Sequence, residues 1–257
     1  MSSQLTSLGI RFQRIDALDA RIASDSEIAG QFRDGGPLGE ISKGDKCCSV
    51  SHRRAWKAFD ESGDRFGLIL EDDVAIDPEA AGLLGNDDWI PPEVDLLKLE
   101  RFGPSGQRVL VGKLVKLSRG WNVGRLHSRH TGAGAYIISR RAVEILLGQH
   151  GRWAIPVDHM LFNPNISVLP RLLRPYQMVP PVARQSTAIG GRTDIADGRA
   201  KLRQFNWRYF RRELVRAYFE LRILPTQLLG VIRGESSLMR IEATKRQPMS
   251  PLLQSKS

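Results

Sequence analysis

The sequence predicts an α/β domain in which helices cover a layered sheet with mixed strand pairing. Short apolar runs alternate along the chain with segments that have helical spacing, which is the pattern of strands followed by helices. One of these runs, Phe66–Leu70, leads directly into three acids, Glu71, Asp72 and Asp73. With 257 residues, 41% of them hydrophobic, the chain can also bury one good core.

The first part of the chain is expected to contain an early strand and one long helix. Residues 12–19 resemble a strand that ends in acid, and residues 22–43 are expected to form a loop. Asp45 is a good N-cap for a helix that runs to Ser62 and ends before Gly63. The apolar face of this helix would contain Cys48, Ala55 and Phe59.

The middle of the chain predicts more strands and two shorter helices. Phe66–Leu70 is bounded by glycine and charge, which is typical of a buried strand. Residues 78–84 are expected to form a short helix, and Ser139 is expected to cap a helix that ends before Gly148. Further strands are expected over residues 95–99, over residues 109–117 as half of a hairpin, and over residues 133–138.

The composition of the chain changes near Gly190, which suggests three parts. Residues 1–190 would form the main domain, residues 191–245 a basic helical extension, and residues 246–257 a disordered tail. Between Arg199 and Arg222 there are eight Lys or Arg residues and two Glu residues, interleaved with aromatic and aliphatic side chains. This pattern predicts a basic amphipathic helix. Its aromatic side could lie on an anionic membrane or could pack against the main domain.

The charge and the cysteines restrict the partners and the compartment. A net charge of +10 implies an anionic partner, whether a nucleotide, a nucleic acid or a membrane surface. The N-terminus lacks the basic and apolar regions of a secretory signal, and no run reaches the length of a membrane-spanning helix. Cys47 and Cys48 are adjacent, so we expect two reduced core residues in a cytoplasmic protein.

The three acids after Phe66–Leu70 are the leading candidates for chemistry. Ligands of open α/β sheets bind outside the carboxyl ends of the strands, where these acids would lie. Clustered carboxylates repel one another, and a hard divalent cation held together with substrate phosphates would relieve the repulsion. The alternative is a solvated turn in which Asp72 or Asp73 caps a helix.

Six segments in order resemble glycosyltransferase family 25, the lipopolysaccharide sugar transferases. Together they cover roughly residues 10–190. The segments are Arg14-Ile-Asp-Ala-Leu-Asp19, Gly39-Glu-Ile41, Cys48-Ser-Val-Ser-His52 with Trp56, Leu68-Ile-Leu-Glu-Asp-Asp-Val74, Thr131-Gly-Ala-Gly-Ala-Tyr136 with Ser139, and Pro156-Val-Asp-His159. The resemblance implies a GT-A-like fold and inverting transfer of a hexose, often galactose, from a UDP-sugar to a saccharide or glycolipid acceptor.

The chain departs from the family pattern at its start. Family members usually begin with a strand that helps to hold the nucleotide, whereas this sequence opens inside the helix that should follow it. About two dozen residues of a strand-plus-helix unit are therefore missing by comparison. The sheet is expected to lack its first strand, and a truncated homologue without catalysis becomes an alternative to an active enzyme.

The resemblance assigns roles to the acids and to the histidine before them. Asp73 and Glu71 would form an acid-x-acid motif for Mn²⁺ or Mg²⁺, which would bridge the donor diphosphate. Glu71 or Asp72 would orient the ribose or the metal-bound waters. His52 could touch the donor phosphate or sugar, or could be an ordinary histidine on the helix surface. Asp16 could face the nucleotide, or could be a turn acid.

The later segments supply the other candidates. Asp158 is the candidate base that takes a proton from the acceptor hydroxyl, and the alternative is an N-cap of the helix that follows. His159 could join the metal shell or could be a structural hydrogen-bonding residue. The small residues of Thr131–Ala135 could let a sugar approach the backbone, or could form a glycine bulge in a strand. They do not form a dinucleotide fingerprint, because the third glycine is missing.

Three functions remain open at this point. The first is a metal-dependent glycosyltransferase that works on an envelope saccharide, located in the cytoplasm or at the inner face of the cytoplasmic membrane. The second is a non-catalytic relative that binds saccharide or membrane. The third is a nucleic-acid-binding protein, because arginines interleaved with aromatics can stack on bases. We do not expect a nucleic-acid partner, since the acid cluster has the wrong charge for a phosphate groove.

Overall fold

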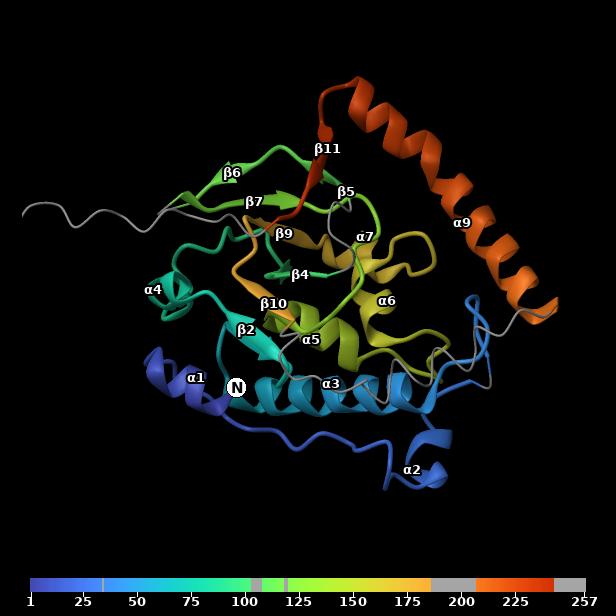
Figure 1. The fold of residues 1–257 in the computed structure, drawn as a ribbon, viewed down its shortest axis with the longest axis horizontal. Helices are drawn as coiled ribbons and strands as arrows, with labels where there is room; N and C mark the ends of the chain where they lie inside the picture. Colours follow the sequence, from blue (N-terminus) through green and yellow to red (C-terminus); the bar gives the residue numbers. More distant parts are fainter. Residues whose placement is uncertain (34, 103–107, 118–119, 186–206, 243–257) are drawn as a thin grey trace, which may run out of the picture.

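The largest sheet among the described residues has six strands, of which Figure 1 labels β6, β7 and β9. The computed structural model describes residues 1–33, 35–102, 108–117, 120–185 and 207–242. The strand order is β1-β8-β3-β9-β7-β6, and β3 and β9 are parallel while the other neighbours are antiparallel. The predicted mixed sheet is thereby confirmed. Its strands are β1 (Phe66–Leu70), β3 (Leu96–Lys98), β6 (Val115–Lys116), β7 (Asn122–Arg125), β8 (Ala135–Ser139) and β9 (Tyr176–Val179).

Two smaller sheets complete the described strands. One contains β2 (Val74–Ile76), β10 (Ala183–Gln185) and β4 (Glu100–Arg101), and the other pairs β5 (Arg108–Gly112) with β11 (Ser236–Arg240). The hairpin expected over residues 109–117 is therefore only partly right. Val115–Lys116 pairs with the next strand, β7, whereas β5 pairs with a strand from the far end of the described chain.

The central strands separate two hydrophobic clusters. In β8, Tyr136 and Ile138 belong to one cluster, while Ala135 and Ile137 belong to the other. This division follows from the two-residue period of a strand, which sends successive side chains to opposite faces. The first cluster lies against α3 (Lys43–Ser62) and α5 (Arg140–Leu147).

Helix α3 begins two residues before the expected cap. Ser42 is the N-cap, and its hydroxyl accepts a hydrogen bond from the Asp45 amide, so Asp45 lies in the first turn. Gly63 ends the helix with a φ of 79°, as its position predicted. The expected apolar face was partly wrong, because the buried apolar side chains of this helix include Cys47, Val50, Trp56 and Phe59. For α5, the expected cap at Ser139 and end at Gly148 are confirmed.

The N-terminal segment differs from the expectation. No strand forms over residues 12–19, and the backbone there bonds to α3 instead, since Leu18 N–H donates to Ser51 Oγ and Arg54 donates to the Asp16 carbonyl. Helix α1 (Ser2–Ser7) precedes this segment, and α2 (Asp25–Ala29) interrupts the expected loop. Farther along, the short helix expected over residues 78–84 is confirmed as η1 (Pro78–Ala80) and α4 (Ala81–Leu84).

Strand β1 is an edge strand, not the fully buried strand that its apolar sequence predicted. All five residues are half-buried, and β8 is the strand that pairs with it among the described residues. The pairing runs from Phe66 opposite Ser139 to Leu70 opposite Ala135. Phe59 of α3 lies so close to Gly67 that an added Cβ would be 2.7 Å from the Phe59 ring. The edge strand is thus fixed by β8 on one side and by α3 on one face.

The remaining described helices are α6 (Val157–Phe162), α7 (Leu169–Leu173) and the long α9 (Trp207–Ile232). Helix α9 confirms a helix within the predicted basic extension, and Figure 1 shows it along one side of the molecule. Residues 191–206 of that extension and the tail expected over 246–257 lie outside the described residues. In the described part of the chain, each helix is too short or too polar to cross a bilayer.

We predict that Gly67→Ala destabilises the protein because the new methyl group cannot fit against the buried Phe59 ring. The expected loss is roughly 1–3 kcal/mol of unfolding free energy. Gly30→Ala is the matched control, since an added Cβ there meets nothing within 4 Å and the φ of −67° suits alanine. Denaturant unfolding measures both variants, and equal stabilities would contradict this packing of β1 on α3.

Candidate functional site

The three acids lie at the carboxyl end of β1, as the sequence predicted. The Glu71 amide still donates a hydrogen bond to the Gly134 carbonyl at 2.8 Å, so the strand pairing extends one residue beyond β1. Asp72 and Asp73 then form a turn that leads into β2. Asp72 is exposed and Asp73 is half-buried. The acid that caps the following η1 helix is Asp77, not Asp72 or Asp73.

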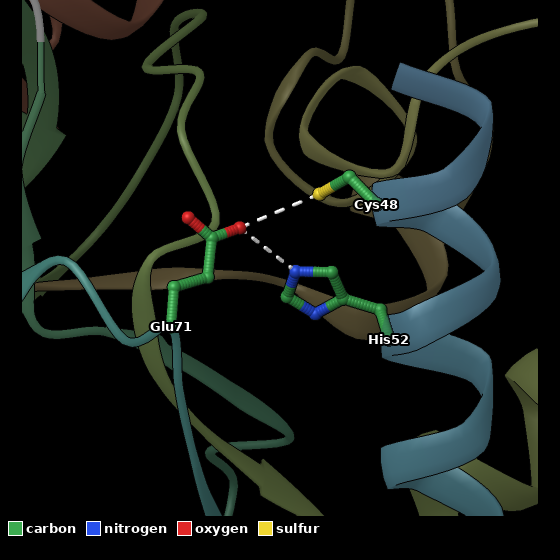
Figure 2. Close-up of side chains that lie close together, drawn as sticks. All are labelled: Cys48, His52 and Glu71. Carbon is green, nitrogen blue, oxygen red and sulfur yellow. Dashed lines mark hydrogen bonds and ion pairs between the residues drawn. The ribbon is translucent and has the colours of Figure 1, made fainter. Parts of the chain in front are cut away.

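Glu71 is held by two side chains of α3 (Figure 2). Its Oε1 lies 3.1 Å from His52 Nε2 and 3.4 Å from Cys48 Sγ. His52 is only 4% exposed, so the alternative of a helix-surface histidine is wrong. Cys47 and Cys48 are both free thiols as expected; Cys47 is buried in the core, and Cys48 is half-buried and packs against it. Cys48 was not predicted as a site residue, although its place one helical turn from His52 could have indicated it.

A buried hydrogen-bond chain orients His52. Trp56 Nε1–H donates to Tyr136 Oη at 2.8 Å, and Tyr136 Oη lies 2.8 Å from His52 Nδ1. Because the indole can only donate, Tyr136 is free to donate its own hydrogen to His52 Nδ1. His52 then carries its proton on Nε2 and donates it to Glu71 Oε1. Every donor in this arrangement has an acceptor, so the chain of bonds orients His52 and the Glu71 carboxylate.

These contacts keep Glu71 ionised and Cys48 neutral. Burial alone would raise the pKa of Glu71, but the hydrogen bonds from His52 and Cys48 outweigh it, so the pKa lies below its usual value. Burial, followed by the negative charge of Glu71, raises the pKa of the Cys48 thiol well above its usual value. Cys48 is therefore a hydrogen-bond donor to Glu71 at neutral pH and not a reactive thiolate.

Asp73 differs from Glu71 in that no described residue donates a hydrogen bond to its buried side-chain oxygen, Oδ1. Burial and then the charges of Glu71, Asp72 and Glu100 raise the pKa of Asp73 to about 6. A buried carboxylate oxygen with no donor, beside other carboxylates, is a suitable ligand for a cation. The site therefore fits the divalent ion that the sequence predicted, with Asp73 as its best ligand.

A buried ion pair that the sequence did not predict lies next to Asp73. Lys98 and Glu100 are both 0% exposed, and Lys98 Nζ lies 2.8 Å from Glu100 Oε1. Lys98 also donates to the Gly132 carbonyl, and the Gly134 amide donates to Glu100 Oε1. Glu100 Oε2 is buried without a partner in the described part of the chain. The alternating Leu-Lys-Leu-Glu sequence could have revealed this pair, since residues i and i+2 share one face of a strand.

The glycines before β8 make room for protein side chains. Gly132 has a φ of 94°, and an added Cβ would be 2.5 Å from the Phe102 ring. At Gly134, an added Cβ would be 2.9 Å from Glu100 Oε2. Strand β8 begins after these glycines, so they do not form a bulge within it. The close neighbours of an added Cβ at these glycines are Phe102 and Glu100, and the approach of a sugar to this backbone stays a prediction.

Asp158 lies near this cluster and is 8% exposed. Its Oδ2 lies 3.4 Å from the Gly132 amide, and its negative charge contributes to the raised pKa of Cys48. The N-cap of α6 is Pro156, so the alternative role of Asp158 as the cap is wrong. His159 is not part of the Cys48–His52–Glu71 cluster, and its Nδ1 lies 2.8 Å from Asn163 Nδ2.

Asp16 lies apart from the acids. It is exposed and forms an ion pair with Arg14, with 3.4 Å between Nε and Oδ1. Its backbone carbonyl bonds to Arg54 of α3, whereas Cys48 and His52 of α3 contact Glu71. Glu71 and His52 are thus in direct contact. The charges of Glu71 and Asp73 affect each other, and the charge of Asp158 affects Cys48. Asp16 has no recorded contact with Cys48, His52, Glu71 or Asp73 among the described residues.

We predict that Asp73→Asn stabilises the metal-free protein near pH 7.5 but not near pH 4. The folded-state pKa of about 6 is above the ordinary 3.8, so the folded protein binds more protons between these values. Stability is therefore lost as the pH rises through about 6. After solvent screening of this half-buried group, the expected gain near pH 7.5 is on the order of 1 kcal/mol. Thermal unfolding at both pH values measures it, with the exposed Asp88→Asn as control. An unchanged or lower stability near pH 7.5 would contradict it.

Comparisons with known proteins agree with the resemblance in the sequence. Residues 1–161 match the family model "Glycosyltransferase family 25 (LPS biosynthesis protein)". The lacto-N-neotetraose biosynthesis glycosyltransferase LgtB of Neisseria meningitidis serogroup B is 28% identical over 170 residues, which cover 60% of this chain and 59% of LgtB. The lipooligosaccharide biosynthesis protein lex-1 of Haemophilus influenzae is 28% identical over 178 residues, covering 64% and 57%. The match thus spans about three fifths of the length of these relatives. Because the family model matches more than half of the chain, this protein belongs to glycosyltransferase family 25.

Proposed function

We propose that this protein is a metal-dependent inverting glycosyltransferase that moves a hexose from a UDP-sugar to a lipooligosaccharide or related envelope saccharide. Galactose is the hexose we favour. Family membership and the names of the relatives support the reaction class and the acceptor class. The observation that carries the metal dependence is the buried Asp73 Oδ1 at the carboxyl end of β1, which has no hydrogen-bond partner in the described part of the chain.

Asp73 would hold Mn²⁺ or Mg²⁺ together with the exposed Asp72. When bound, the ion supplies positive charge to the diphosphate as the glycosidic bond breaks. Glu71 keeps one orientation, because its Oε1 accepts hydrogen bonds from His52 and Cys48. Glu71 is therefore suited to orient the ribose or the waters around the ion. Both ring nitrogens of His52 bond to protein side chains, Tyr136 and Glu71. We therefore propose that His52 orients Glu71 and does not contact the phosphate.

Asp158 is the proposed base. Its carboxylate accepts hydrogen bonds from two backbone amides, those of His159 at 2.8 Å and Gly132 at 3.4 Å. These bonds fix its position next to the loop before β8, where Lys98 and Glu100 also bind. In an inverting reaction, one carboxylate removes the proton of the acceptor hydroxyl opposite the leaving group. Asp158 would do this, while His159 as a further metal ligand and Asp16 as a nucleotide contact remain predictions.

A non-catalytic saccharide-binding relative is the second candidate. The observation in its favour is the unpaired edge of β1, where the described residues provide no second partner for the strand that carries the acids. The third candidate, a nucleic-acid-binding protein, has no support from the acid cluster. Donor binding and turnover distinguish the first candidate from the second.

We predict that two single substitutions separate donor binding from chemistry. With UDP-galactose and Mn²⁺, Asp73→Asn should lose metal-dependent donor binding, because its carboxylate holds the ion. Asp158→Asn should bind the donor normally but lower kcat by about 10²–10⁴-fold, the usual contribution of a general base. Calorimetry measures binding, and release of UDP measures turnover.

The exposed Asp88→Asn is the control for both variants, since it lies outside the site. Donor binding without turnover in the unsubstituted protein would favour the non-catalytic candidate. Wild-type turnover in Asp73→Asn would refute the metal role, and wild-type kcat in Asp158→Asn would refute the base.

We also propose that α9 attaches the protein to an anionic membrane, where a lipid-linked acceptor would be found. Phe219, Ile223 and Gln227 lie half-buried on the side of α9 that faces the domain, and Gln227 bonds to the His127 carbonyl. The opposite side carries a row of exposed apolar residues at helical spacing, namely Phe210, Leu214, Tyr218, Leu221, Leu228 and Ile232. The exposed Arg211 and Arg222 border this row. Packing of the basic helix against the main domain and its binding to a membrane are thus compatible, because one face of α9 packs while the other stays exposed.

We predict that Leu221→Glu weakens binding to phosphatidylglycerol vesicles by about tenfold or more, because a buried leucine contributes about 1.5–3 kcal/mol. Vesicle co-sedimentation measures the affinity. Leu172→Glu is the control, since Leu172 is 50% exposed on α7. High salt should also weaken binding, as each arginine near the surface contributes about 1 kcal/mol. Self-association through α9 without vesicle binding would overturn the membrane proposal.

A further inference from the structure

Cys48, His52 and Glu71 combine three kinds of metal-binding atom in one place. Cys48 and His52 are four residues apart on α3, so their side chains leave the same face of the helix. Glu71 approaches them from the end of β1 (Figure 2). One ligand atom from each residue lies within 4.8 Å of the other two, and no other such group of three is found among the described residues.

The distances between these atoms suit a tetrahedral ion. Zinc bonds of about 2.3 Å to sulfur and about 2.0–2.1 Å to nitrogen and oxygen place sulfur about 3.5 Å from oxygen, and nitrogen about 3.4 Å from oxygen. In the structure, Cys48 Sγ lies 3.4 Å from Glu71 Oε1, and His52 Nε2 lies 3.1 Å from it. An ion could therefore replace the two hydrogen bonds with small movements of the side chains.

We propose that Cys48, His52 and Glu71 form a binding site for a thiophilic divalent ion, with Zn²⁺ as the best fit. A sulfur ligand selects against Mg²⁺ and Mn²⁺, which prefer oxygen. This site is therefore chemically distinct from the oxygen ligands Asp72 and Asp73, although it shares the segment that carries them. The inference concerns the free protein and does not depend on the proposed transferase activity.

The buried surroundings match what a zinc-bound histidine needs. Ligand histidines usually donate their second ring N–H to a fixed oxygen, and Tyr136 Oη lies 2.8 Å from His52 Nδ1. On binding, the Cys48 thiol would release its proton to solvent, and the His52 proton would move from Nε2 to Nδ1. Tyr136 Oη has two lone pairs, so it can accept from both His52 and Trp56. The Glu71 side chain is 29% exposed, which leaves an open side for water as the fourth ligand.

Cobalt substitution tests the site directly, because Co²⁺ bound to a thiolate gives a charge-transfer absorption in the near ultraviolet. The full chain titrated with Co²⁺ should show this absorption at one equivalent, and Zn²⁺ should abolish it. Cys48→Ser should remove the band and lower Zn²⁺ affinity at least about tenfold. Tyr136→Phe should lower Zn²⁺ affinity about tenfold, because it removes the hydrogen-bond partner of the His52 ligand. Cys47→Ala is the matched control and should keep the band, since Cys47 is a core residue.

Circular dichroism of each variant excludes loss of folding as the cause. Asp73→Asn should keep the cobalt band even if it loses Mn²⁺-dependent donor binding, so failure of one proposal is distinguishable from failure of the other. A wild-type titration without the band would overturn the inference. So would a band of equal intensity in folded Cys48→Ser, or loss of the band in folded Cys47→Ala.

Discussion

The negative charge gathered at the carboxyl end of β1 is the constraint on which the site depends. Burial, followed by the negative charges of Glu71, Asp72 and Glu100, raises the pKa of Asp73 to about 6. Like charges in a partly buried site are unfavourable unless each has a partner. Glu100 has Lys98 and the Gly134 amide, and Glu71 has His52 and Cys48. Asp73 Oδ1 is left without a partner among the described residues, so an added cation would relieve the repulsion there.

The same contacts secure an edge strand. Because β1 pairs only with β8 in the described part of the sheet, its free edge would let the strand end open more easily than a central strand. The bonds from His52 and Cys48 attach the end of the strand to α3, and Phe59 packs against Gly67 in its middle. Residues that fix the direction of the Glu71 carboxylate therefore also fix the position of the acids that follow it.

Local sequence signals predicted the parts of the site that depend on strand ends and helix caps. The acids after Phe66–Leu70, the helix ended by Gly63 and the cap at Ser139 needed only neighbouring residues to identify them. The ion pair of Lys98 and Glu100 and the approach of Cys48 to Glu71 were missed. Cys48 and Glu71 are 23 residues apart, and only the packing of α3 on β1 shows which helix face meets the strand end.

The misassigned N-terminal strand has a related cause. Residues 12–19 have the composition of a strand, but a strand needs a neighbour for its backbone groups. Here the Leu18 amide and the Asp16 carbonyl bond to side chains of α3, so these two backbone groups have partners without a neighbouring strand. Residues 12–19 therefore do not pair with β1, and the edge of β1 stays free in the described part of the sheet. Helix α3, and not a further strand, contacts both residues 12–19 and Glu71. The positions of the acids in the candidate site therefore depend on how rigidly α3 packs against the sheet.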